Sequence, residues 1–174
     1  MLFPETTLTA TPPTKEPLTK DLKNMEVAIQ QARLGFEEGG IPIGGALASR
    51  PKTSFSADGK LLGVGRNKRI QEGSPTKHGE IDCLENIGRL SALVYKGCTM
   101  YTTLSPCTMC SGAIVLFGIR RVVLGENTTF VGGEDILISR GVEIINLDLT
   151  ECKELMIKFT EAAPEVWNED IGEE

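Results

Sequence analysis

The chain has 174 residues, of which 40% are hydrophobic, so it is long enough for one domain with a buried core and too short for two domains of ordinary size. Its 18 basic and 24 acidic residues give a formal net charge of −6. Because no basic run is longer than a pair such as Arg120-Arg121, this charge argues against nucleic acid as a partner and favours a small neutral substrate.

The first 20 residues are rich in Thr and Pro and contain no basic segment followed by an apolar run, which argues against a signal peptide and a membrane span. We expect a flexible tail over residues 1–20 and a single domain over residues 21–174. The five cysteines, an odd number, favour free thiols or metal ligation over disulfides. We therefore expect a cytoplasmic protein that can also enter the nucleus by diffusion. We expect no membrane partner.

Periodicity of the apolar residues predicts an alternation of helices and strands. In chain order we predict a helix over 21–38, strands over 41–48 and 61–65, a helix over 78–90, a strand over 98–104, a helix over 107–117, strands over 121–125 and 142–147, and a helix over 150–162 that is stopped by Pro164. The first two strands are expected to form a hairpin. This order predicts an α/β fold, a three-layer α-β-α sandwich around a mixed five-stranded sheet.

Two glycines, Gly44 and Gly45, lie inside the first predicted strand. A glycine in a strand often marks a place where another backbone or a ligand approaches closely. No nucleotide-binding glycine motif is present here, so we interpret both glycines as packing positions.

Two short motifs contain residues that bind metals. The only histidine begins the sequence HGE, and a gap of 25 residues separates this motif from the sequence PCTMC. Cys107 and Cys110 are three positions apart, so they share one face of the predicted helix. A zinc ion held by His78, Cys107 and Cys110 would have a fourth position for a water, which the metal makes more acidic. We predict one Zn²⁺ per chain with a bound water.

Glu80 lies two residues after His78, and a carboxylate beside such a water can take its proton and later return it. We therefore predict Glu80 to be a proton shuttle, not a ligand. Both motifs lie at predicted helix N-termini, whose free N–H groups stabilise thiolates. We expect Cys107 and Cys110 to be deprotonated before zinc binds.

The combined pattern His-x-Glu…Pro-Cys-x-x-Cys is the signature of the zinc-dependent deaminases. Several alternatives stay open. A CxxC pair can be a redox motif, and a zinc site can be structural, in a non-catalytic zinc-stabilised binding protein, although such a site usually has a fourth Cys or His. The signature also does not determine the substrate, which could be a free base such as cytosine or guanine, a nucleoside such as cytidine, a nucleotide, or an adenosine of tRNA.

Longer segments closely resemble the yeast-type fungal cytosine deaminases. These segments are GGIPIGG from residue 39, HGEIDCLENIGRL from 78, YTTLSPCTMCSGAI from 101, GEN from 125 and WNEDIGE from 167. The resemblance covers nearly everything after the tail except residues 51–57, where this chain carries extra loop residues. It implies a cytidine-deaminase-like fold, a homodimer, and hydrolysis of free cytosine to uracil and ammonia in pyrimidine salvage, with ring-substituted cytosines also accepted.

The resemblance also implies which residues contact the pyrimidine: Asn67, Gly79, Ser105, Phe130, Trp167 and Asp170. Asn67 and the Gly79 N–H would hydrogen-bond the ring, and Ser105 would line the metal side of the pocket. Phe130 and Trp167 would cover the base, and Asp170 would bind its polar edge. Without the resemblance, Asn67 is typical of a turn and Asp170 of a solvated acidic tail.

Overall fold

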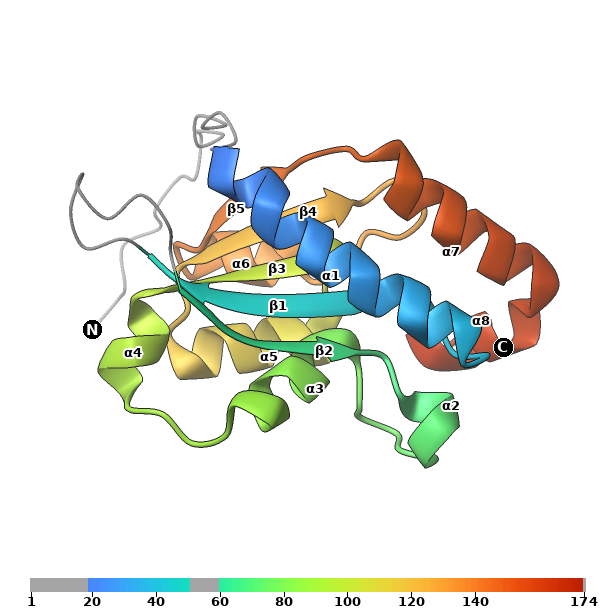
Figure 1. The fold of residues 1–174 in the computed structure, drawn as a ribbon, viewed down its shortest axis with the longest axis horizontal. Helices are drawn as coiled ribbons and strands as arrows, with labels where there is room; N and C mark the ends of the chain where they lie inside the picture. Colours follow the sequence, from blue (N-terminus) through green and yellow to red (C-terminus); the bar gives the residue numbers. More distant parts are fainter. Residues whose placement is uncertain (1–18, 51–59, 174) are drawn as a thin grey trace, which may run out of the picture.

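The computed structural model describes residues 19–50 and 60–173, so most of the predicted tail and the extra loop at 51–57 lie outside the described residues. One sheet of five strands lies at its centre, in the order β2-β1-β3-β4-β5 (Figure 1). The strands are β1 (Gly44–Ser49), β2 (Leu61–Arg66), β3 (Cys98–Leu104), β4 (Arg121–Glu126) and β5 (Glu143–Asn146). β1 is antiparallel to both neighbours, whereas β3, β4 and β5 are parallel, so the predicted mixed sheet is confirmed.

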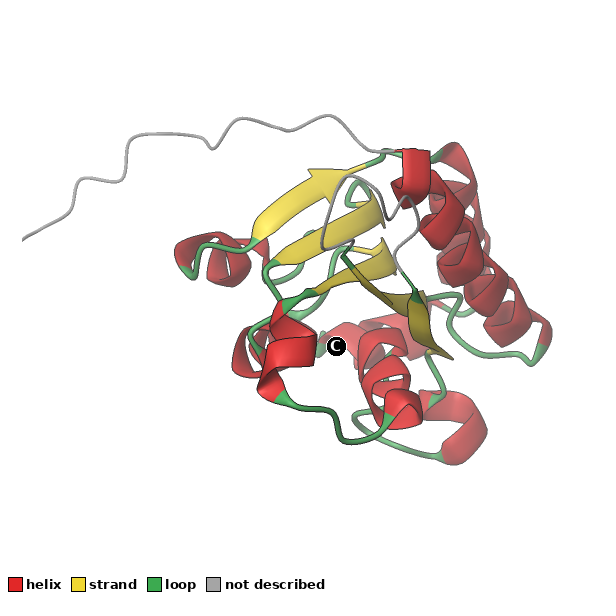
Figure 2. Ribbon diagram, turned by 60° about the vertical axis from the view of Figure 1, so that its left-hand side comes forward, coloured by secondary structure: helices red, strands yellow, loops and turns green. Residues whose placement is uncertain are grey.

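Helices cover both faces of this sheet (Figure 2). They are α1 (Thr19–Glu37), α2 (Arg69–Glu72), α3 (Gly79–Ile87), α4 (Ala92–Lys96), α5 (Thr108–Phe117), α6 (Glu134–Ser139), α7 (Thr150–Ala162) and α8 (Pro164–Ile171). α1 and α7 lie on one face, and α3, α5 and α6 lie on the other (Figure 1). The three-layer α-β-α sandwich is therefore confirmed.

Each strand contributes side chains to the core on both faces of the sheet, because successive side chains of a strand point to opposite faces. Ala46 and Tyr101 pack in the cluster with α1, together with Met25. Their chain neighbours Leu47 and Met100 pack in the other cluster, which includes residues of α3 and α5. Both clusters are buried, so the sheet is apolar on its two faces.

Three boundaries differ from the predictions by more than one residue. α1 begins at Thr19, so the last two residues assigned to the tail belong to the helix. β1 begins at Gly44 and not at residue 41, because the preceding segment contains Pro42, which has no N–H for a strand ladder. α3 ends at Ile87 because Gly88 follows with a φ of 72°, a conformation that favours glycine.

The segment after Pro164, predicted to be an acidic tail, is the helix α8. α7 ends at Ala162 as predicted, and Pro164 occupies the first turn of α8. Proline is favoured there because the first helical N–H has no partner within the helix and the fixed φ suits a helix. The prediction of a tail was wrong because the proline that stops one helix also begins the next.

Two adjacent glycines let both helical layers approach the start of β1. A Cβ on Gly44 would lie 2.0 Å from the Ala28 carbonyl oxygen of α1. A Cβ on Gly45 would lie 2.8 Å from the Gly79 carbonyl oxygen, on the opposite face. This geometry confirms their interpretation as packing positions and places the first residue of α3 directly on the sheet.

None of the helices in the described ranges is long and apolar enough to cross a membrane.

Candidate metal centre and active site

His78 and Cys107 are the N-cap residues of α3 and α5. An N-cap side chain usually accepts a hydrogen bond from the first free N–H groups of its helix, but neither residue makes such a bond. Their backbone carbonyls still accept helical bonds, from Asp82 and Ser111 at 2.8 Å each. The cap geometry therefore holds both backbones while the imidazole and the thiol are free for another partner.

The side chains of His78, Cys107 and Cys110 converge. Their ligand atoms all lie within 4.8 Å of one another. His78 Nδ1 lies 3.5 Å from Cys107 Sγ. Tetrahedral zinc bonds of about 2.1 Å to nitrogen and 2.3 Å to sulfur separate such a pair of ligand atoms by about 3.5 Å. The donor set therefore fits zinc and provides three of its four positions.

The two thiols differ in acidity. A hydrogen bond from the Cys110 thiol is the main reason that the pKa of Cys107 falls to about 4. The same interaction, followed by burial, raises the pKa of Cys110 well above its usual value. Cys110 therefore keeps its proton until a metal replaces it. These opposite shifts favour a single thiolate in the pair before a metal binds, at Cys107, so the deprotonation expected of both cysteines stays a prediction.

Glu80 is the second residue of α3 and is 2% exposed. Its Oε1 accepts a hydrogen bond of 2.8 Å from the Thr102 hydroxyl of β3. Burial, and secondarily the nearby charge of Cys107, raises the pKa of the Glu80 carboxyl. A carboxyl whose pKa is raised toward neutrality is suited to both taking and returning a proton.

A small cavity adjoins the metal-ligand group. It is lined by Ile43, His78, Glu80, Leu104, Ser105, Cys107, Phe130, Trp167, Asp170 and Ile171. Its volume is about 10 Å³, and a single water needs about 10–15 Å³ by this measure. A base can therefore enter only if the covering side chains move.

Two aromatic rings from distant parts of the chain close this cavity. Phe130 and Trp167 meet edge to face, with ring centroids 5.7 Å apart and an interplanar angle of 89°. Trp167 and Asp170 are three positions apart on α8, so they point to the same side of this helix. The helix that was predicted to be a tail thus forms one wall of the cavity.

The loop that carries Phe130 is held by buried polar groups. The Ser105 hydroxyl donates to Glu134 at 2.7 Å and accepts the Gly132 N–H at 3.0 Å. The fully buried Glu126 carboxylate accepts two backbone N–H groups of the same loop, at 2.6 and 3.0 Å. Ser105 therefore lines the cavity and also helps to hold the loop that carries Phe130.

Asn67 and Gly79 lie beside the cavity but do not line it. Asn67 is fully buried; its Nδ2 donates to Asp170 Oδ1 at 3.3 Å and its Oδ1 accepts the Arg69 N–H at 3.0 Å. The second bond is typical of a turn residue. Gly79 begins α3, so its N–H has no partner within the helix.

Comparison with known families now decides the class of protein. The family described as "Cytidine and deoxycytidylate deaminase zinc-binding region" matches residues 18–126, more than half of the chain. The chain belongs to this deaminase family. The matched range includes Glu80 and the three residues of the metal-ligand group, and zinc is the cofactor of this deaminase.

Individual relatives cover most of the deaminase. The cytosine deaminase of Candida albicans is 52% identical over 153 residues, which are 88% of this chain and 97% of the Candida protein. A tRNA-specific adenosine deaminase of Aquifex aeolicus is 28% identical, over 78% of this chain and 90% of that protein. A structure from a study of A-to-I editing by tRNA:A34 deaminases has a TM-score of 0.63 at 26% identity, covering 77% of this chain and 99% of that one.

Sequence analysis missed several residues of the deaminase site. Ile43 and Leu104 line the cavity, and Thr102 contacts Glu80. Ile43 lies within the GGIPIGG segment and Leu104 directly precedes Ser105, so their positions could have indicated a role. Arg69 contacts α8 across 100 residues of chain, and no local pattern predicts such a contact.

Proposed function

We propose that this deaminase hydrolyses free cytosine to uracil and ammonia in pyrimidine salvage. The covered cavity above the metal ligands carries the proposal, because two aromatic rings and a carboxylate with a polar edge suit a small flat base. The likeness to the Candida cytosine deaminase over almost the whole chain supports it.

In the proposed reaction, His78, Cys107 and Cys110 hold the zinc ion, which supplies the acidity that makes water a nucleophile near neutral pH. Glu80 takes a proton from the attacking water and delivers it to the ring nitrogen beside C4 of the base. The water oxygen bonds to C4, and Glu80 then carries the remaining proton of that oxygen to the amino group. The C4–N bond breaks, ammonia leaves, and the oxygen stays on C4 as a carbonyl of uracil. The Thr102 hydroxyl holds the Glu80 carboxylate in place throughout.

We propose that the base binds with its ring against Phe130 and Trp167, while the Asp170 carboxylate accepts an N–H from its polar edge. Asn67 and the Gly79 N–H reach the base once α8 moves to admit it. The small cavity supports such a movement, because its volume of about 10 Å³ cannot hold a pyrimidine. The Ser105 side chain lines the cavity on the side of the metal.

The shuttle is tested by Glu80→Gln, with Glu85→Gln on the same helix as the matched control. The Glu85 side chain is 56% exposed, so its replacement should leave turnover unchanged. Glu80→Gln should lower kcat for cytosine by about 10⁴-fold, because the amide cannot carry a proton. Zinc content, measured on the purified variants, should stay at one ion per chain. Normal deamination by Glu80→Gln would show that the assignment is wrong.

The substrate is tested by ultraviolet-monitored turnover of cytosine, cytidine, guanine and adenine. We expect cytosine and cytosines with small ring substituents to react, and cytidine to react at least about a hundredfold more slowly because a ribose clashes with the cover. Cytidine turnover at the rate of cytosine would contradict the free-base proposal. Zinc binding without ammonia release from any base would favour the non-catalytic alternative.

We also infer that the deaminase is a homodimer that pairs through α3, α4 and α5. A cavity of about 520 Å³ on this face is lined mainly by apolar residues, including Leu84, Leu90 and Phe117. Leu93 and Leu116 beside it are 82% and 80% exposed. Exposed apolar surface of this kind usually marks a protein interface. Leu116→Glu should give a monomer by light scattering, and a stable dimer of this variant would refute the assignment.

We propose a single deaminase domain that begins with α1 and a cytoplasmic location. All five cysteines are free, which suits a reducing compartment. Imaging of a fluorescent fusion tests the location, and signal confined to a secretory compartment would contradict it.

A further inference from the structure

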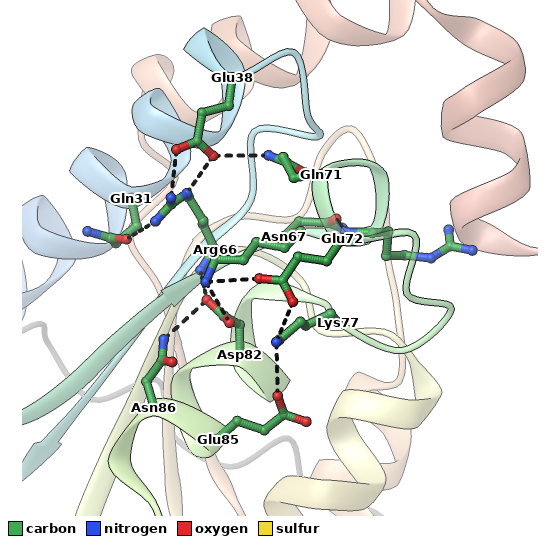
Figure 3. A network of polar contacts seen from close by, with 12 residues as sticks. Gln31, Glu38, Arg66, Asn67, Gln71, Glu72, Lys77, Asp82, Glu85 and Asn86 are labelled. Carbon is green, nitrogen blue, oxygen red and sulfur yellow. Dashed lines mark hydrogen bonds and ion pairs between the residues drawn. The ribbon is translucent and has the colours of Figure 1, made fainter.

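The segment that carries Asn67 is fastened by cations on both sides of it. Arg66 pairs with Glu38, the residue after the end of α1, at 2.6 Å and donates to Gln31 of α1 at 3.3 Å. Lys68 pairs with Asp82 of α3 at 3.1 Å. Figure 3 shows Arg66 between Glu38 and Asp82, beside Asn67. The segment is thus tied to the helices on both faces of the sheet.

The third cation of this segment, Arg69, reaches a different helix. Its Nη1 donates to Asp170 Oδ1 at 2.8 Å and its Nη2 donates to Glu169 Oε1 at 2.6 Å, both on α8. The Asp170 side chain is 3% exposed and that of Arg69 is 11% exposed, whereas Glu169 is 68% exposed. The two Nη atoms of Arg69 thus form a fork with two arms. The arm that ends on Asp170 is buried, and the arm that ends on Glu169 is exposed.

Three groups converge on a single oxygen of Asp170. Besides Arg69, the Asn67 Nδ2 lies 3.3 Å from Oδ1, and His78 Nε2 lies 3.6 Å from it. Within residues 19–50 and 60–173, no hydrogen bond ends on Oδ2. Because Asp170 lines the cavity, this second oxygen is free to accept an N–H of a bound base.

We propose that Arg69 is a positioning residue that fixes the Asp170 carboxylate and holds α8 over the cavity. Arg69 does not itself line the cavity, so it acts through Asp170 and α8. This inference rests on the proposed role of Asp170 in binding the base. Without Arg69, the nearly buried carboxylate loses its cationic partner, and the direct ion-pair link between α2 and α8 is broken.

The fork geometry explains why an arginine is required. A guanidinium has several N–H donors in one plane and can hold two carboxylates at once, whereas a lysine ammonium is a compact point charge. Arg69→Lys should therefore retain the charge but not both contacts to α8. Its effect should lie between those of the unchanged protein and Arg69→Gln.

The test combines kinetics with a direct probe of α8. Trp167 is the only tryptophan of the chain, lies on α8 and is 8% exposed, so its fluorescence quenching by acrylamide reports whether α8 is seated. Arg66→Gln is the matched control, because it makes the same charge change in the same segment but removes the pair with Glu38 and leaves α8 untouched. Glu169→Gln removes only the exposed arm of the fork.

For Arg69→Gln we expect the acrylamide quenching constant to rise at least about twofold and kcat/KM for cytosine to fall about tenfold to a hundredfold, mainly through KM. Arg69→Lys should restore part of both losses. Arg66→Gln should stay within about twofold of the unchanged protein in both measurements, and Glu169→Gln, which weakens only the exposed contact, should lose clearly less than Arg69→Gln. This pattern supports the proposal.

Two results would overturn the proposal. One is unchanged quenching and unchanged KM in Arg69→Gln, and the other is an equal loss in Arg66→Gln, which would mean general loosening of the segment. If the unchanged protein does not deaminate cytosine, the proposed function fails. The quenching comparison still decides in that case whether Arg69 seats α8.

Discussion

Gly45→Ala tests how closely the catalytic helix must lie against the sheet. The added Cβ would meet the Gly79 carbonyl oxygen at 2.8 Å and the Gly79 carbonyl carbon at 3.0 Å. Ordinary van der Waals contact begins at 3.4 Å, so the start of α3 must retreat by about 0.6 Å. That retreat carries His78 and Glu80 away from Cys107, which belongs to another helix.

Overpacking of this kind costs about 1–3 kcal/mol of unfolding free energy. A misplacement of 1 Å in an active site can cost about a hundredfold in rate, so a shift of about 0.6 Å should cost about tenfold in kcat. Both quantities are measurable, by urea denaturation and by ultraviolet-monitored turnover of cytosine. Zinc analysis of the same sample shows whether the lost rate reflects lost metal.

Two other glycines provide controls. Gly112 lies in α5, where an added Cβ would have no neighbouring atom of the described residues within 4 Å, so Gly112→Ala should stabilise the protein by about 0.5–1 kcal/mol and leave kcat unchanged. In Gly44→Ala the added Cβ collides with α1 on the opposite face of the sheet. This variant should therefore have a lower free energy of unfolding, while kcat of its folded fraction should change little. A Gly45→Ala variant with the stability and kcat of the unchanged protein would refute this reasoning.

Further predictions concern the metal, the core and the cover. Removing zinc with a chelator should abolish ammonia release and lower Tm by about 5 °C or more, measured by calorimetry, because a ligand of the folded state stabilises it. Asp21→Asn should cost about 3–5 kcal/mol in urea unfolding without changing KM, since it removes the fully buried carboxylate that holds the Arg121 guanidinium at 2.8 Å and leaves only the more distant, partly exposed Glu143 at 3.5 Å. Trp167→Ala should raise KM for cytosine about tenfold by removing one of the covering rings; an unchanged KM would contradict that role.

The sequence was sufficient to predict the metal-ligand group because all its members belong to two local motifs. His78 and Cys107 lie next to predicted helix starts, and the structure makes both residues N-caps. Helix periodicity placed Cys110 on the same face as Cys107, and the ligand atoms indeed converge. Short-range geometry of this kind is determined by a few neighbouring residues.

Contacts between distant segments could not be predicted in the same way. Asp170 looked like one acid in a solvated tail, yet Arg69 and Asn67 bury it from about 100 positions earlier in the chain. Likewise, the hydrogen bond between Thr102 and Glu80 depends on how α3 lies across β3. Only the packing of the helices on the sheet brings these partners together, so composition and periodicity cannot reveal them.

The boundary of the family match falls between the metal-ligand motifs and the residues that cover the cavity. The match ends at residue 126, so it includes Glu80 and the metal ligands but not Phe130, Trp167 or Asp170. The side chains that cover the cavity therefore lie outside the region matched by the family model. In this chain α8 and the loop of Phe130 reduce the cavity to about 10 Å³. It follows that substitutions in the cover should change which base is accepted and how tightly it binds, whereas substitutions in the matched motifs should stop deamination of every base.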